Sequence, residues 1–201
     1  MMDEKVICAG FGGQGVMSMG QLLAYAAMIE GKNVTWMPSY GPEMRGGTAY
    51  CCVMICDRPV GSPVIANDAS CSIVMNLPSL RKFEKSLVAG GYLLVNSSMI
   101  DERSERDDVH EYYIPADELA MECGNRRAAN MIMLGAYLEI SRAVQPENVM
   151  EAFKKVFGEK AEKLLPLNRE ALRKGMEYAA ILGASSREQN SGFLGAAQTA
   201  L

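Results

Sequence analysis

The chain alternates short apolar runs with longer segments in which apolar residues recur every three or four positions. Short unbroken apolar runs are typical of buried strands, and the longer period is typical of helices with one buried face. The runs predict strands over residues 6–9, 34–37, 48–56, 72–76, 92–95 and 110–114, and the period predicts helices over 16–29, 78–88, 117–122, 126–144, 146–158 and 161–182. This order predicts an α/β fold with a mostly parallel sheet flanked by helices and a helical C-terminal third.

No linker or internal repeat divides the sequence. We expect a single α/β domain over residues 1–182, because a chain of 201 residues can bury one good core. Residues 183–201 are rich in Ala, Ser, Gly and Gln. This tail is predicted to be loosely held or bound to a partner.

A glycine-rich motif, GFGGQG over residues 10–15, lies between the first predicted strand and the first predicted helix. Gly10, Gly12 and Gly15 have the G-x-G-x-x-G spacing, which allows a sharp turn and the close approach of a ligand or another chain. The unpaired N–H groups at the start of a helix favour an anion such as a phosphate. The motif predicts an anion or cofactor contact or, alternatively, a tight turn that serves only helix-on-strand packing.

The sequence after this motif disfavours an NAD site. Dinucleotide sites of this type use an acidic residue about 20 positions further on, at the end of the second strand, to hold the ribose hydroxyls. Residues 33–40 contain no Asp or Glu, and the first acid is Glu43, beyond a Gly-Pro turn. The anion, if there is one, is expected to belong to a different ligand.

The loop over residues 38–47 is a second candidate for ligand contact. It follows the second predicted strand, at the sheet edge where sites form in open α/β folds, and we expect it to lie next to the glycine-rich turn. Its polar side chains include Ser39, Tyr40, Glu43 and Arg45. The alternative is a surface connection in which Pro and Gly only set turns.

Composition and charge narrow the function classes. Hydrophobic residues make up 49% and charged residues 22% of the chain, as in ordinary globular proteins. The formal net charge of −4 argues against a nucleic-acid partner. No apolar run is long enough for a membrane span and the N-terminus does not resemble a signal peptide, so no membrane association is expected and the cytoplasm is the expected location.

The six cysteines do not form a metal motif. They lie at positions 8, 51, 52, 56, 71 and 123, without a C-x-x-C and without the spacings that hold zinc or iron–sulfur clusters. We expect buried, reduced thiols that act as small apolar residues. A single histidine, His110, cannot build a metal site, and we assign it no role.

Four segments together resemble a known family: GFGGQG, TWMPSYGPEMRGGTAYC, DRPVGSP and MNLPSLRKF. They are similar to the gamma subunit of 2-oxoacid:ferredoxin oxidoreductases, most of all to the 2-oxoglutarate and 2-ketoisovalerate types. The resemblance covers about residues 6–95, with a looser match near Asn130. The beta subunit of indolepyruvate oxidoreductase has a similar glycine turn and R-G-G, and is the weaker match.

The resemblance implies a Rossmann-like α/β fold and a role inside a larger enzyme. Such complexes decarboxylate a 2-oxoacid with thiamine diphosphate, pass electrons through iron–sulfur clusters to ferredoxin and release an acyl-CoA. Alpha and beta subunits, and often a small delta subunit, are the implied partners. Thiamine diphosphate sites usually contain a G-D-G motif, and this sequence has none. It also lacks the cysteine spacing that binds iron–sulfur clusters. Thiamine diphosphate, Mg and the clusters are therefore expected on those partners.

Coenzyme A is the ligand that the resemblance and the glycine turn together imply for this chain, which is expected to supply no catalytic residue and no metal ligand. The backbone N–H groups of residues 12–15 would contact phosphate. The candidate cofactor-binding residues are Gly10, Gly12, Gly13, Gln14, Gly15, Ser39, Tyr40, Arg45, Gly46 and Gly47. Two alternatives stay open: the SYGPEMRGG segment is mainly a docking loop against the alpha and beta subunits, or the chain is a stand-alone nucleotide- or CoA-binding module.

Overall fold

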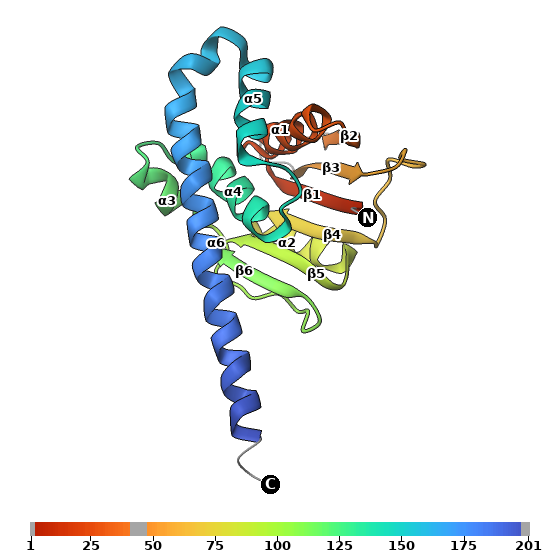
Figure 1. Ribbon diagram of the computed structural model, residues 1–201, viewed down its shortest axis with the longest axis vertical. Helices are drawn as coiled ribbons and strands as arrows, with labels where there is room; N and C mark the ends of the chain where they lie inside the picture. The colour runs from red at the N-terminus through yellow and green to blue at the C-terminus, as the bar shows by residue number, and fades with distance from the viewer. Residues whose placement is uncertain (1–2, 41–47, 198–201) are drawn as a thin grey trace.

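The structure, a computed structural model, describes residues 3–40 and 48–197, with side chains for 3–39, 48–159 and 161–184. A six-stranded sheet in the order β2-β3-β1-β4-β5-β6 forms its centre (Figure 1). The strands are β1 (Asp3–Phe11), β2 (Asn33–Tyr40), β3 (Thr48–Cys56), β4 (Ala69–Val74), β5 (Leu87–Asn96) and β6 (His110–Ile114).

Five of these strands run in the same direction, and β3 alone among them is reversed. Strands β1, β4, β5 and β6 pair in parallel, whereas β3 pairs antiparallel with both β1 and β2. The prediction of a mostly parallel sheet is therefore confirmed. Since Ala49 of β3 is opposite both Gly10 of β1 and Tyr40 of β2, the carboxyl end of β2 lies two strands from the glycine motif, about 10 Å away. We expected these two ends to be adjacent, and the reversed strand separates them.

Helices cover the two faces of the sheet unequally. The larger core cluster joins one face to α1, α3, α4, α5 and α6, and the smaller one joins the other face to α2 and the loop at Ile100. The helices are α1 (Val16–Ile29), α2 (Leu77–Phe83), α3 (Ala116–Glu122), α4 (Ala129–Ser141), α5 (Pro146–Phe157) and α6 (Ala161–Ala197), with 3-10 turns η1 (Glu84–Ser86), η2 (Arg126–Ala128) and η3 (Gly158–Lys160).

Helices α4 and α6 cross with their backbones in contact. A Cβ atom on Gly135 of α4 would collide with the carbonyl oxygen of Leu172, and one on Gly175 of α6 would collide with that of Ile132. Each helix thus has a glycine where the other helix approaches. In Figure 1, α6 passes across α4 and continues well past the sheet toward the C-terminus.

Several predicted boundaries differ from the structure, among them those of three helices. The helix expected over 78–88 ends at Phe83, because the segment from Leu87 joins the sheet, with Leu87 opposite Ala69. The helix predicted over 117–122 begins one residue earlier, at Ala116, and its N-cap is Pro115. The last helix extends to Ala197 instead of ending at Leu182.

None of the helices in residues 3–40 and 48–197 combines the length and the apolar character that crossing a membrane requires.

Candidate functional site: a cleft between the glycine loop and an arginine turn

The glycine loop is shaped by close packing at its two ends. A Cβ on Gly10 would lie 2.7 Å from Oε1 of Gln14 and 2.9 Å from Cβ of Met75, so only glycine fits there without displacing them. Gly15 has φ 75°, and a Cβ on it would lie 2.6 Å from Nδ2 of Asn130. These two glycines let the loop lie close to the end of β4 and to α4.

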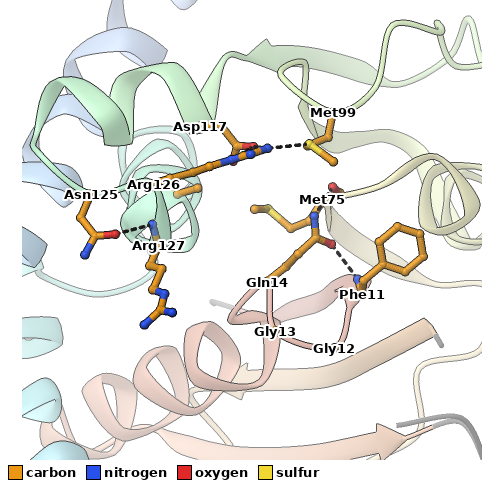
Figure 2. A pocket seen from close by; sticks show the side chains of 11 residues that line it. Phe11, Gly12, Gly13, Gln14, Met75, Met99, Asp117, Asn125, Arg126 and Arg127 are labelled. Carbon is orange, nitrogen blue, oxygen red and sulfur yellow. Dashed lines mark hydrogen bonds and ion pairs between the residues drawn. The ribbon is translucent and has the colours of Figure 1, made fainter. Parts of the chain in front are cut away.

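The side chain of Gln14 holds the loop closed. Its Oε1 accepts a hydrogen bond from the Phe11 N–H at 2.6 Å, and its Nε2 donates to the Met75 carbonyl at 3.0 Å (Figure 2). The Gln14 N–H also donates to the Phe11 carbonyl at 3.1 Å. The amide thus links the end of β1 to the end of the neighbouring β4, which makes Gln14 a residue that positions the loop.

A cleft of about 590 Å³ opens beside this loop. The glycine loop forms one wall, and the turn that precedes α4 forms the other (Figure 2). The residues that line it are Phe11, Gly12, Gly13, Gln14, Met75, Met99, Asp117, Asn125, Arg126, Arg127 and Ala129.

The two arginines of the cleft differ in their partners. Arg126 donates to Oδ2 of Asp117 from Nε at 2.9 Å and from Nη2 at 2.6 Å, so its charge is balanced locally. Arg127 is exposed, and its guanidinium has no carboxylate partner among the described side chains. Figure 2 shows Arg127 pointing away from Arg126, toward the start of α1. Among the described side chains, Arg127 therefore gives the cleft one uncompensated positive charge beside the glycine loop.

The backbone of the turn is held by Asn125. Its Oδ1 accepts the N–H of Arg127 at 3.0 Å, as an asparagine at the start of a helix commonly does. This contact fixes the direction in which the Arg127 side chain leaves the backbone.

The glycine loop supplies further donors. Within the described part of the chain, no acceptor is found for the N–H groups of Gly12 and Gly13. These groups lie just before α1, where the helix dipole adds partial positive charge. Loop donors on one side and Arg127 on the other form an arrangement suited to a phosphate or another anion.

The structure brings together part of the predicted site. Of the ten predicted residues, Gly12, Gly13 and Gln14 line the cleft, whereas Gly10 is beneath the loop and Gly15 lines a neighbouring cavity. Ser39 and the backbone of Tyr40 are at the end of β2, beyond β3. Arg45, Gly46 and Gly47, like the rest of the SYGPEMRGG loop after Tyr40, are outside the described residues, and their roles remain predictions.

Sequence reasoning missed the wall of the cleft that Arg126 and Arg127 form, here called the arginine wall. Residues 126–144 were predicted only as a helix, with no role for Arg126 and Arg127 in ligand contact. One signal was available: two basic residues begin this helix, where the helix dipole disfavours cations. That placement is unfavourable for the helix alone, and an anion at the same end would offset it.

The cysteines are buried, as predicted, except that Cys123 is partly exposed, and none of the six forms a disulfide. Burial raises the pKa of the Cys52 thiol to about 11, which keeps it protonated at neutral pH. Across residues 3–40 and 48–197 no three His, Cys, Asp or Glu side chains are grouped as metal ligands would be.

A sequence model of one protein family, described as pyruvate ferredoxin/flavodoxin oxidoreductase, matches residues 5–178. The chain belongs to this oxidoreductase family. The resemblance that the GFGGQG and SYGPEMRGG motifs indicated is thereby confirmed.

Relatives of the chain include subunits named for ketoisovalerate oxidoreductase and 2-oxoglutarate synthase. The chain is 40% identical over 178 residues to the ketoisovalerate oxidoreductase subunit VorA of Methanothermobacter thermautotrophicus, covering 88% of this chain and 36% of the relative. It is 35% identical over 160 residues to the 2-oxoglutarate synthase subunit KorC of Methanothermobacter marburgensis, covering 76% of this chain and 86% of the relative. The chain thus spans about a third of the length of the first curated relatives it matches.

Solved structures of the oxidoreductase family have the same fold. A keto/oxoacid ferredoxin oxidoreductase gamma subunit from Geobacter sulfurreducens superposes with a TM-score of 0.75 at 27% identity, over 89% of this chain and 99% of that one. A 2-oxoglutarate:ferredoxin oxidoreductase from Magnetococcus marinus, with 2-oxoglutarate, coenzyme A and succinyl-CoA bound, superposes with a TM-score of 0.81 at 25% identity, over 90% of this chain and 32% of that one.

Proposed function

We propose that the chain is the gamma subunit of a multi-subunit 2-oxoacid:ferredoxin oxidoreductase. Family membership supports this assignment, as does its similarity to subunits named for ketoisovalerate and 2-oxoglutarate enzymes. In the reaction, a 2-oxoacid and coenzyme A give an acyl-CoA and carbon dioxide, while two electrons pass to ferredoxin. Alpha and beta subunits, and in some complexes a delta subunit, are the expected partners and would hold thiamine diphosphate, Mg and the iron–sulfur clusters.

We further propose that the cleft holds phosphate groups of coenzyme A, the acyl acceptor. The observation that carries this is the pairing of Arg127, which lacks a carboxylate partner in the described structure, with the open N–H groups of Gly12 and Gly13 across the cleft. Coenzyme A has three phosphate groups, and the related Magnetococcus marinus enzyme was solved with coenzyme A bound. The role of the cleft is to bind and orient, and no residue of this chain is assigned a proton transfer.

The first experiment isolates the complex from its own host, anaerobically, and identifies its chains by intact mass. Co-purifying chains that carry thiamine diphosphate and iron–sulfur clusters are the expected result. A lone chain without these partners would contradict the subunit assignment.

The second experiment measures the KM for coenzyme A in complexes with Arg127→Ala. Loss of a hydrogen-bonded charge pair weakens binding by about 10- to 100-fold, so KM is expected to rise by that factor with little change in kcat. Arg58→Ala is the matched control, because Arg58 is an exposed arginine at the opposite end of the sheet. An unchanged KM in Arg127→Ala would remove the phosphate-binding role and leave the subunit assignment intact.

A further inference from the structure

A second cavity, here called the side pocket, adjoins the cleft. It has a volume of about 280 Å³ and lies among α1, α4, α5 and α6. Asn125 and Arg127 line both cavities. A ligand group held at Arg127 would therefore lie at the entrance to the side pocket.

Apolar side chains form one part of the side pocket. The rings of Phe153 and Phe157 are in contact, with centroids 4.5 Å apart, and Leu167 is partly buried beside them. Leu164 is 41% exposed, which is high for a leucine next to a cavity. These walls present apolar surface that a flat ring could cover.

Two nearly buried amides belong to the polar part of the side pocket, together with Ser18, Asn125 and Arg127. Asn130 and Asn168 are each only 9% exposed. Nδ2 of Asn130 donates to the Gly15 carbonyl at 3.2 Å, and Nδ2 of Asn168 donates to the Leu164 carbonyl at 2.8 Å. These bonds determine which end of each amide is the oxygen.

The oxygen of each amide remains available. No described donor contacts Oδ1 of Asn130 or Oδ1 of Asn168. An amide oxygen of a side chain that lines a cavity can accept a hydrogen bond from a donor on a bound ligand. The side pocket thus combines apolar walls with two acceptors.

We propose that the side pocket binds the adenine base of coenzyme A while Arg127 holds a phosphate at its entrance. Adenine is flat, and its exocyclic amine is a hydrogen-bond donor that an amide oxygen of the pocket can accept. Arg127 suits the junction because its apolar stem can line the pocket while its guanidinium binds phosphate. This assignment rests on the proposed function and adds to it the place where the base is recognised.

Calorimetric titration of the intact protein, in the form in which it purifies, tests the assignment with two probes. Coenzyme A contains the base, whereas 4′-phosphopantetheine keeps the thiol arm and one phosphate but lacks the nucleoside. We expect Asn168→Leu to weaken coenzyme A binding by about tenfold and to change 4′-phosphopantetheine binding by less than about twofold. Arg127→Ala should weaken the binding of both probes. Asn33→Leu, at the far end of β2, is the matched control and should change neither.

A coenzyme A analogue with hypoxanthine in place of adenine gives a test without any substitution, so it does not depend on how the variant folds. The analogue replaces the amine donor by a carbonyl and should bind the unaltered protein about tenfold more weakly than coenzyme A. In Asn168→Leu the difference between the two ligands should shrink.

The outcomes separate the two proposals. If the unaltered protein binds no coenzyme A, the proposed contact itself is overturned. The other case is that the protein binds coenzyme A and Arg127→Ala weakens this binding. Equal effects of Asn168→Leu on both probes, or equal affinities for coenzyme A and its hypoxanthine analogue, would then overturn only the side-pocket assignment.

Discussion

The side-chain amide of Gln14 donates a hydrogen bond to the main-chain carbonyl of Met75 at 3.0 Å, joining residues that are 61 positions apart in sequence. Through the same amide, the Phe11 N–H is also satisfied. The side-chain amide of Gln14, which sequence analysis assigned to ligand contact, is thus engaged within the protein. Gln14 is expected to act on the ligand through the shape of the glycine loop.

Two substitutions separate the structural and electrostatic consequences of this contact. Gln14→Ala removes both hydrogen bonds and should lower the free energy of unfolding by about 1–2 kcal/mol, measured by urea denaturation. Gln14→Glu keeps an acceptor for Phe11 but adds a negative charge beside the cleft, so it should weaken coenzyme A binding more than Gln14→Ala does. Stronger binding in Gln14→Glu would contradict an anionic ligand.

Gly15 should be the glycine of the loop least tolerant of a side chain. Gly15→Ala combines φ 75° with a Cβ 2.6 Å from Nδ2 of Asn130, and we expect destabilisation by about 2–3 kcal/mol. Gly13→Ala is the control, because Gly13 has φ 98° but no atom within 4 Å of the added Cβ, and about 1 kcal/mol is expected. Thermal unfolding checks both, and equal losses would show that contact with Asn130 contributes nothing.

Asp117 should set how much positive charge the cleft presents. Asp117→Asn removes the carboxylate that balances Arg126, and coenzyme A should then bind about two- to tenfold more tightly at low ionic strength, with the gain reduced by salt. Glu118→Gln neutralises the neighbouring acid, which does not line the described cleft. It should have the smaller effect in the same titrations.

Glu30 should make stability depend on pH. Burial opposes ionisation of this carboxyl, but hydrogen bonds from Asn148, the Gln145 N–H and Lys32 outweigh it and lower its pKa. Because the pKa is lower in the folded state than in the unfolded state, the contribution of Glu30 is full above the ordinary value of 4.5. It is lost as pH falls through the lowered folded-state pKa.

The measurement is urea denaturation between about pH 6 and pH 3. Glu30→Gln keeps an acceptor oxygen for the same donors but cannot titrate, so its free energy of unfolding should fall less steeply over this range. Identical slopes in both proteins would mean that other carboxyls account for the acid dependence.

The central strands could be predicted because they contain buried apolar runs, such as Val6–Ala9 and Leu93–Val95. The first helix could be predicted because Gly15 and the apolar period of α1 mark it clearly. The direction of β3 could not be predicted, since an apolar run on its own has no direction. The arginine wall depends on long-range packing that brings Asn130 to Gly15, 115 positions away. The local sequence pattern around either residue does not predict that contact.

The crossing of α4 and α6 at Gly135 and Gly175 has a consequence for the ligand. With backbone against backbone, neither helix can tilt or slide without a collision, so the start of α4 is held rigidly. Arg127 leaves the turn just before that start, and Asn168 lies on the other helix of the same crossing. The backbone of the proposed coenzyme A site is therefore expected to be preorganised, so that little backbone conformational entropy is lost when coenzyme A binds.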